Sequence, residues 1–102
     1  MSHISRASLI FEFKGVQHDL VLQMVLWQLP RPTRDRPHGI KYLLYLGRAG
    51  KTLVRYDNEA GKGDHRHLGS SETEVSYDFL SVDRLLSDFR GDYAAHGWRW
   101  TE

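Results

Sequence analysis

Apolar and polar residues alternate along several segments of the chain, and this period of two is typical of β-strands with one buried face. The alternating segments are residues 9–14, 52–57 and 75–79. A turn is predicted at residues 15–19, after the first segment. Residues 40–46 and the second segment are separated by a short stretch, 48–51, in which Gly50 can adopt a positive φ at little steric cost. These residues predict a β-hairpin.

The run at residues 20–27 is apolar at both alternating sets of positions. One face of a strand would carry leucine and methionine, and the other would carry Val21, Val25 and Trp27. A buried helix is the alternative interpretation. The β-branched and aromatic residues of the run, and the Pro30 that follows it, favour a strand. A strand that is apolar on both faces is usually central or covered by another element.

The C-terminal part of the chain predicts one amphipathic helix from Ser81 to about residue 96. Ser81 is a favourable N-cap, and Asp83 suits the positive end of the helix dipole. Apolar residues recur at helical spacing at Val82, Leu85, Leu86, Phe89 and Tyr93. Gly97 is placed to end the helix. Residues 98–100 alternate again and are expected to close the domain as an edge segment.

Together these elements predict an α+β fold, an antiparallel sheet of four to five strands with a C-terminal amphipathic helix packed on one face. Residues 1–102 are enough for one small domain and too few for two. The chain lacks the regular alternation of strands and helices found in dinucleotide-binding domains, so that class is excluded.

Composition narrows the class of protein. The chain has no cysteine, which excludes disulfides, thiolate metal sites and a cysteine nucleophile. Its formal charge is +1, so nucleic-acid binding would need a local basic cluster. No apolar run approaches the ~20 residues that cross a bilayer, and no signal core follows the start. We therefore expect a cytoplasmic protein with no membrane partner.

All three prolines lie in residues 30–39, which predicts a loop because proline cannot donate to a strand ladder. This proline-rich loop also carries Arg31, Arg34, Arg36 and His38. It is interpreted either as a basic arm that contacts phosphates or as a solvated loop in which arginine supplies solubility. His38, like His3, His18 and His96, has no evident partner in the sequence.

The densest polar segment is residues 55–67, at the end of the predicted hairpin. It combines arginine, lysine, aspartate, asparagine and histidine with two glycines. Polar groups this dense are seldom needed for folding and indicate a site for an anion, a metal ion or a proton transfer. Under strand alternation, we expect Arg55, Asp57, His65 and His67 to converge in one cleft.

One chemistry for this segment is metal-independent acid–base catalysis on RNA. Histidine titrates near neutral pH, and cleavage through the 2′-hydroxyl needs one group to take a proton and another to give one. His65 and His67 would be these groups, with Asp57 as the third catalytic residue. The candidates for binding phosphate or RNA are Arg55, Asn58, Lys62 and Arg66. Because both histidines are placed in a loop, the fold is expected to survive their replacement.

Three alternatives stand beside this chemistry. His65 and His67 with Asp57 or Asp64 could bind Zn²⁺ or another divalent ion, as in a metal-dependent hydrolase. The segment could bind a phosphate or a protein without catalysis, through its glycine backbone and basic side chains. It could also be purely structural, with Asx turns and surface ion pairs.

Several stretches of the chain resemble the TumE-like toxin family. They are residues 24–30, 38–42, 55–67 and 79–89, and together they span nearly the whole chain. The most specific part is Arg-Tyr-Asp-Asn at 55–58 with the Gly-Asp-His-Arg-His that follows it. The resemblance implies the toxin half of a prokaryotic toxin–antitoxin pair, whose usual partner is a small helix-turn-helix antitoxin.

The sequence therefore predicts a toxin that acts on or binds RNA, without a cofactor, and whose candidate enzyme class is ribonuclease. One helix can cover only one face of the sheet, while residues 20–27 are apolar on both. A partly apolar surface should therefore serve the antitoxin or a homodimer. Trp27, Trp98 or Trp100 should lie in that surface, since tryptophan is a common interface anchor.

Overall fold

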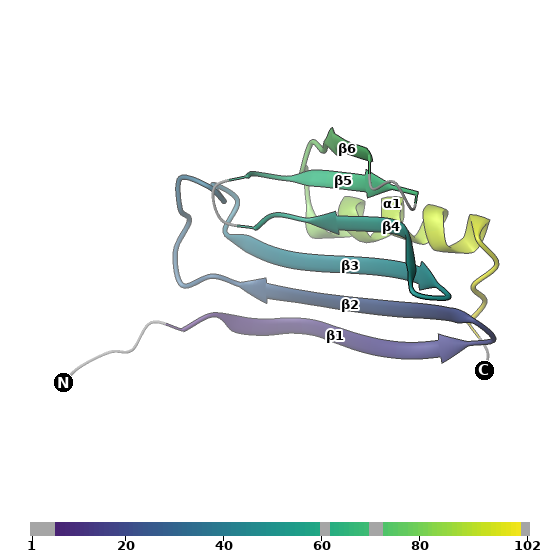
Figure 1. The fold of residues 1–102 in the computed structure, drawn as a ribbon. Helices are drawn as coiled ribbons and strands as arrows, with labels where there is room; N and C mark the ends of the chain where they lie inside the picture. The colour runs from purple at the N-terminus through teal and green to yellow at the C-terminus, as the bar shows by residue number, and fades with distance from the viewer. Residues whose placement is uncertain (1–5, 60–61, 70–72, 101–102) are drawn as a thin grey trace.

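The computed structural model describes residues 6–59, 62–69 and 73–100. Six strands among these residues form one antiparallel sheet in sequence order, and one helix packs behind it (Figure 1). The strands are β1 (Ser8–Gln17), β2 (Leu20–Gln28), β3 (Ile40–Arg48), β4 (Lys51–Asp57), β5 (His65–Leu68) and β6 (Thr73–Ser76). The helix is α1 (Val82–Ala95).

Helix α1 begins where the sequence predicts, because Ser81 caps it. The Ser81 Oγ accepts a hydrogen bond from the backbone N–H of Arg84 at 3.0 Å, which satisfies a donor of the first turn. The buried side chains Leu85, Phe89 and Tyr93 recur every four residues and face the sheet. Within the described parts of the chain, no helix has the length and apolar character needed to cross a bilayer.

The core lies between α1 and one face of the sheet, here termed the covered face. The strands β2, β3 and β4 bury alternate residues there: Leu20, Leu22, Met24, Leu26, Ile40, Tyr42, Leu44, Leu46, Val54 and Tyr56. The intervening residues, such as Val25 and Leu43, lie on the opposite face and are half-buried. No described helix covers that face, termed the open face (Figure 1). The predicted α+β class is confirmed.

The sheet has six strands where the sequence predicts four to five. The additional strand is β5, which occupies part of the segment interpreted as a loop. Its first three residues are all polar, so no apolar alternation marks it. They pair with residues of β4, which places Asp57 opposite His65, Tyr56 opposite Arg66 and Arg55 opposite His67. Polar cross-strand partners, rather than an apolar face, therefore hold this strand in the sheet.

The turn between β1 and β2 is shorter than predicted. β1 continues to Gln17, which pairs with Leu20, so only His18 and Asp19 remain in the turn. His18 has a φ of 56°, in the left-handed region that tight hairpin turns require. Gly15, Val16 and Gln17, which the sequence predicts to lie in the turn, belong instead to β1.

The last strand, β6, lies earlier than the predicted segment 75–79 and ends at Ser76. Beyond it, Tyr77 packs edge-on against Tyr56 of the covered face, with 5.2 Å between ring centroids. This aromatic contact draws the chain off the ladder and toward α1.

The tail after α1 packs against β1, and residues 98–100 form no strand. Trp98 is buried and meets the ring of Phe13 edge-on at 6.2 Å between centroids. Trp100 is half-exposed and lies 4.9 Å from the same ring. The expected edge segment is therefore wrong, because stacking on Phe13 takes the place of ladder hydrogen bonds.

Replacement of Phe89 by alanine should lower the free energy of unfolding by about 3–5 kcal/mol, because the ring is fully buried under the sheet. Leu80→Ala is the control, since Leu80 is 69% exposed, and its effect should stay within about 0.5 kcal/mol. Urea unfolding followed by circular dichroism measures both. Equal losses in the two variants would contradict this core.

Candidate active site

Four polar side chains of β4 and β5 lie together on the open face. Pairing across the two strands puts Asp57 opposite His65 and Arg55 opposite His67. Residues paired in this way project from the same face of a sheet. The rings of His65 and His67 lie 4.8 Å apart between centroids, at 74° to each other. The structure thus brings these four residues together, and they are termed the histidine cluster.

Asp57 connects the cluster through both of its carboxylate oxygens. The Oδ2 atom lies 3.1 Å from Arg55 Nε, and the Oδ1 atom contacts His65 Nε2. The guanidinium of Arg55 extends further, and its Nη2 lies 3.4 Å from His67 Nε2. One arginine therefore spans the carboxylate and the second imidazole, and each group meets a neighbour of complementary hydrogen-bonding capacity.

The two histidines have different hydrogen-bonding neighbours. His65 Nδ1 lies 3.0 Å from the carbonyl oxygen of Gly63, and its Nε2 meets the Asp57 carboxylate. Both partners can only accept, so a proton on either nitrogen of His65 has an acceptor beside it. His67 Nε2 faces Arg55, which can only donate, so that nitrogen accepts. One imidazole can give a proton and the other can take one.

The cluster is buried although it lies on the open face. Asp57, His65 and His67 are 5%, 3% and 6% exposed. The expectation that the histidines lie in an unburied loop is wrong, because β5 is paired with β4 on one side and β6 on the other. Removal of either ring would leave a buried partner without its hydrogen bond, at a cost to the free energy of unfolding.

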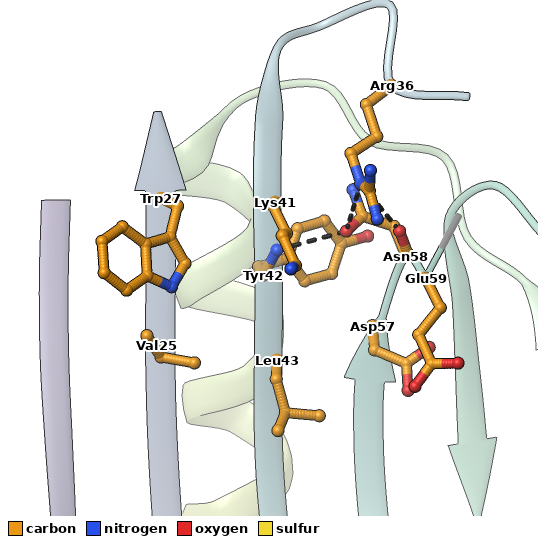
Figure 2. Close-up of a pocket in the computed structure, with 9 residues that line it drawn as sticks. All are labelled: Val25, Trp27, Arg36, Lys41, Tyr42, Leu43, Asp57, Asn58 and Glu59. Atoms are coloured by element: carbon orange, nitrogen blue, oxygen red, sulfur yellow. Dashed lines mark hydrogen bonds between the residues drawn. The ribbon is translucent and has the colours of Figure 1, made fainter. Parts of the chain in front are cut away.

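A pocket of about 280 Å³ lies on the open face beside the cluster (Figure 2). It is lined by Val25, Trp27, Arg36, Lys41, Tyr42, Leu43, Asp57, Asn58 and Glu59. Figure 2 shows the Trp27 indole on one side of it and the carboxylates of Asp57 and Glu59 on the other. Because Asp57 belongs to both the pocket and the cluster, a ligand in the pocket meets the cluster through this carboxylate.

A second polar network surrounds Asp64. Its carboxylate accepts hydrogen bonds from Tyr42 Oη at 2.7 Å, His38 Nε2 at 3.0 Å and Asn58 Nδ2 at 3.2 Å. His38 Nδ1 accepts from the backbone N–H of Ile40 at 3.1 Å, so the His38 proton lies on Nε2. Burial and the bond to Asp64 raise the pKa of the Tyr42 hydroxyl far above its usual range, which keeps it a donor. The network ties the loop before β5 to the proline-rich loop.

The remaining predicted RNA-binding residues lie outside the histidine cluster. Asn58 is buried, and its amide group donates to and accepts from the backbone of β3. Arg66 points to the covered face, where its Nη2 lies 3.1 Å from Asp92 of α1. Lys62 is exposed in the turn before β5. Of the four candidates for binding phosphate or RNA, Arg55 lies in the histidine cluster and the other three lie outside it.

The proline-rich loop is anchored at its C-terminal half. Arg36 turns inward, and its Nε donates to the backbone oxygen of Asn58 at 2.9 Å. His38 stacks on Phe79 with 3.8 Å between ring centroids. Arg31 and Arg34 are exposed. The loop is therefore part of the wall of the pocket and is not simply a solvated connection.

Asp57, His65 and His67 also have the composition of a metal site, with ligand atoms that all lie within 4.8 Å of one another. His65 donates its other N–H to a carbonyl, as metal-bound histidines commonly do. Arg55 argues against a metal ion, because its guanidinium contacts Asp57 and His67 and would repel a second cation. Asp64, the other predicted ligand, is bound to His38. The geometry favours the metal-free interpretation.

Sequence reasoning missed the partner of His38 and the place of Lys41 in the pocket. One feature of the sequence could have revealed the position of His38, namely the predicted hairpin that forms β3 and β4. Its register puts Leu43 opposite Asp57, so the residues just before β3 lie beside those just after β4. Extending that register would have placed His38 near the polar segment.

A family model described as Toxin TumE matches residues 3–96 of the chain, which is well over half of it. The matched range includes the histidine cluster and α1. No curated protein and no solved structure matches the chain.

Tyr42→Phe should lower the free energy of unfolding by about 2 kcal/mol, because it removes a hydrogen bond to the Asp64 carboxylate. Tyr45→Phe is the matched control on the same strand, since no described residue forms a hydrogen bond with the Tyr45 hydroxyl. Urea unfolding of both variants measures the difference. A Tyr42 variant as stable as the control would show that the Asp64 network does not hold the loops.

Proposed function

Because the chain belongs to the TumE toxin family, it is the toxin component of a toxin–antitoxin system, and we propose that it cleaves RNA at the histidine cluster. The observation that carries the proposal is the pair of imidazoles 4.8 Å apart on one face, one beside two acceptors and the other facing a donor, which favours opposite proton states. Cleavage through the 2′-hydroxyl needs one group that takes a proton and one that gives a proton. The proposed class is therefore a metal-independent ribonuclease.

In this mechanism His67 takes the proton of the 2′-hydroxyl, and the 2′-oxygen forms a bond to phosphorus. The bond between phosphorus and the 5′-oxygen breaks, and His65 gives that oxygen its Nδ1 proton, which the Gly63 carbonyl releases as substrate binds. Arg55 lies beside both rings and offsets the negative charge that develops on the phosphoryl oxygens. Asp57 orients His65 and stabilises its imidazolium before the reaction.

The pocket supports an extended substrate. The indole of Trp27 offers a flat surface on which a base can stack, and the exposed ammonium of Lys41 attracts phosphate. Asp57 connects this pocket to the acid and the base. An RNA strand that stacks on Trp27 would thus bring a neighbouring phosphate toward the histidine cluster. RNA as the target places the action of the protein in the cytoplasm.

Two other functions each have one supporting observation. The spacing of the Asp57, His65 and His67 ligand atoms favours a metal-dependent hydrolase. The burial of both imidazoles favours a module that binds a phosphate or a protein without catalysis. The experiments below separate these functions from a metal-independent ribonuclease.

Family membership implies an antitoxin partner. A helix-turn-helix antitoxin that covers the open face would account for neutralisation of the toxin. The half-buried residues Val25, Trp27 and Leu43 form an apolar patch around the pocket. A protein seated on this patch would exclude RNA from the histidine cluster.

Replacement of His67 or His65 by alanine should each reduce RNA cleavage by about 10²-fold or more, because each removes one proton-transfer group. Both variants should relieve growth arrest on expression. His18→Asn is the control, since asparagine tolerates the positive φ of that turn, and it should retain full toxicity. Circular dichroism of the purified variants separates loss of chemistry from loss of fold.

A folded double variant of His65 and His67 with undiminished toxicity would exclude this chemistry. Cleavage that stops in chelator and returns with added Zn²⁺ or Mg²⁺ would identify a metal-dependent hydrolase. Toxicity that persists without any cleavage, and that depends on the pocket, would identify a binding module.

Trp27→Ala should weaken co-purification with the antitoxin encoded beside the toxin, because the indole flanks the pocket. Trp100→Ala is the control, since Trp100 is 52% exposed and packs against Phe13 on the other side of the sheet. Affinity measured by calorimetry for both variants tests the position of the interface. A loss confined to Trp100→Ala would place the antitoxin on the tail instead.

A further inference from the structure

β1 is an edge strand whose outer side is covered by no described segment (Figure 1). It is ten residues long and carries exposed apolar side chains at Leu9, Ile10, Phe11 and Val16. An edge of this length presents a row of unpaired backbone N–H and C=O groups to solvent. Natural proteins seldom leave such an edge open without a partner strand.

The register of the β1–β2 hairpin shows which residues face outward. Gln17 and Leu20 flank a two-residue turn, and the residues that flank such a turn form a hydrogen-bonded pair. Hydrogen bonding alternates along an antiparallel pair, so the backbone groups of Glu12, Lys14 and Val16 point away from β2. The register is regular from Phe11 to Gln17, and its shift lies between Leu9 and Phe11.

We propose that a second copy of this chain pairs antiparallel with β1, with Phe13 on the two-fold axis, so that the two sheets become continuous. The ladder forms only if outward-facing residues of the two copies lie opposite one another. The two-fold axis must therefore pass through a residue of β1 and not between two residues. An axis at Glu12 or at Lys14 would place like charges directly opposite. An axis at Phe13 places Glu12 opposite the second copy's Lys14.

Side chains on both faces agree with this register. Glu12 and Lys14 lie on the open face, since they pair with Val25 and Gln23 of β2. The two-fold axis generates two such opposite-charge pairs, a self-complementary arrangement that a symmetric dimer requires. On the covered face, Phe11 is 41% exposed and would lie opposite Gly15 of the second copy, where the rings of Phe13 and Trp98 already cover the glycine and offer an aromatic surface. The pairing therefore buries an exposed ring.

The pairing would join the open faces of the two copies into one continuous surface. Each copy would contribute one pocket to this surface. The interface uses β1 and leaves the patch around Trp27 uncovered, so a dimer can still bind one antitoxin per copy. The proposal rests on the geometry of the edge strand and is independent of the chemistry at the histidine cluster.

Sedimentation equilibrium of the full chain measures the dissociation constant of the dimer. Reversing and then exchanging the charges of Glu12 and Lys14 tests the proposed register. Each of Glu12→Lys and Lys14→Glu places two like-charge pairs in the interface and should weaken the dimer at least ~10-fold. The double variant Glu12→Lys/Lys14→Glu restores opposite charges and should return the dissociation constant to within about threefold of the original. Lys51→Glu is the charge-matched control, because Lys51 is the first residue of β4 and lies outside the proposed interface; it should not change the dissociation constant.

Lys14→Pro gives a second, independent measurement. It removes an outward N–H that β2 does not use, so the variant should fold and yet stay monomeric. A protein that is monomeric at all concentrations would overturn the proposal. So would a dimer that tolerates the single charge reversals, or one that the double exchange fails to restore.

Discussion

The pairing of β5 with β4 is the constraint on which the fold and the site both depend. A strand that begins His-Arg-His can be buried only if each polar side chain meets a partner. On the open face the partners are Asp57 and Arg55. On the covered face Arg66 reaches Asp92 of α1, and its guanidinium lies 5.4 Å from the centre of the Tyr56 ring. The strand is thus specified by ionic and hydrogen-bonding partners on both sides.

The same contacts that hold β5 in place also set the chemistry of the cluster. The Gly63 carbonyl and the Asp57 carboxylate place an acceptor beside each nitrogen of His65, while Arg55 places a donor beside one nitrogen of His67. In the proposed mechanism, an arginine in this position supplies positive charge without a metal ion. Stability and proposed function are therefore coupled, and variants of the cluster must be judged on their folding as well as their activity.

The sequence predicted the parts of the fold whose signal is apolar periodicity. The hairpin of β3 and β4, the strand β2 and the capped helix α1 all follow from it, and alternation alone put the histidines on one face with Arg55 and Asp57. The strand β5 had no such signal, because its partners are polar. The network around Asp64 was also missed, since His38 and Asp64 are distant in the chain and meet only when the hairpin register is extended beyond the strands.

We propose that His65 and His67 hold opposite proton states in the folded protein. Nitrogen-15 NMR of the histidine side chains near neutral pH measures this directly, because protonated and unprotonated ring nitrogens differ widely in chemical shift. We expect two protonated nitrogens for His65 and one for His67, unchanged when a chelator is added. The same state in both rings, or shifts that change when Zn²⁺ is added at stoichiometric amounts, would contradict it.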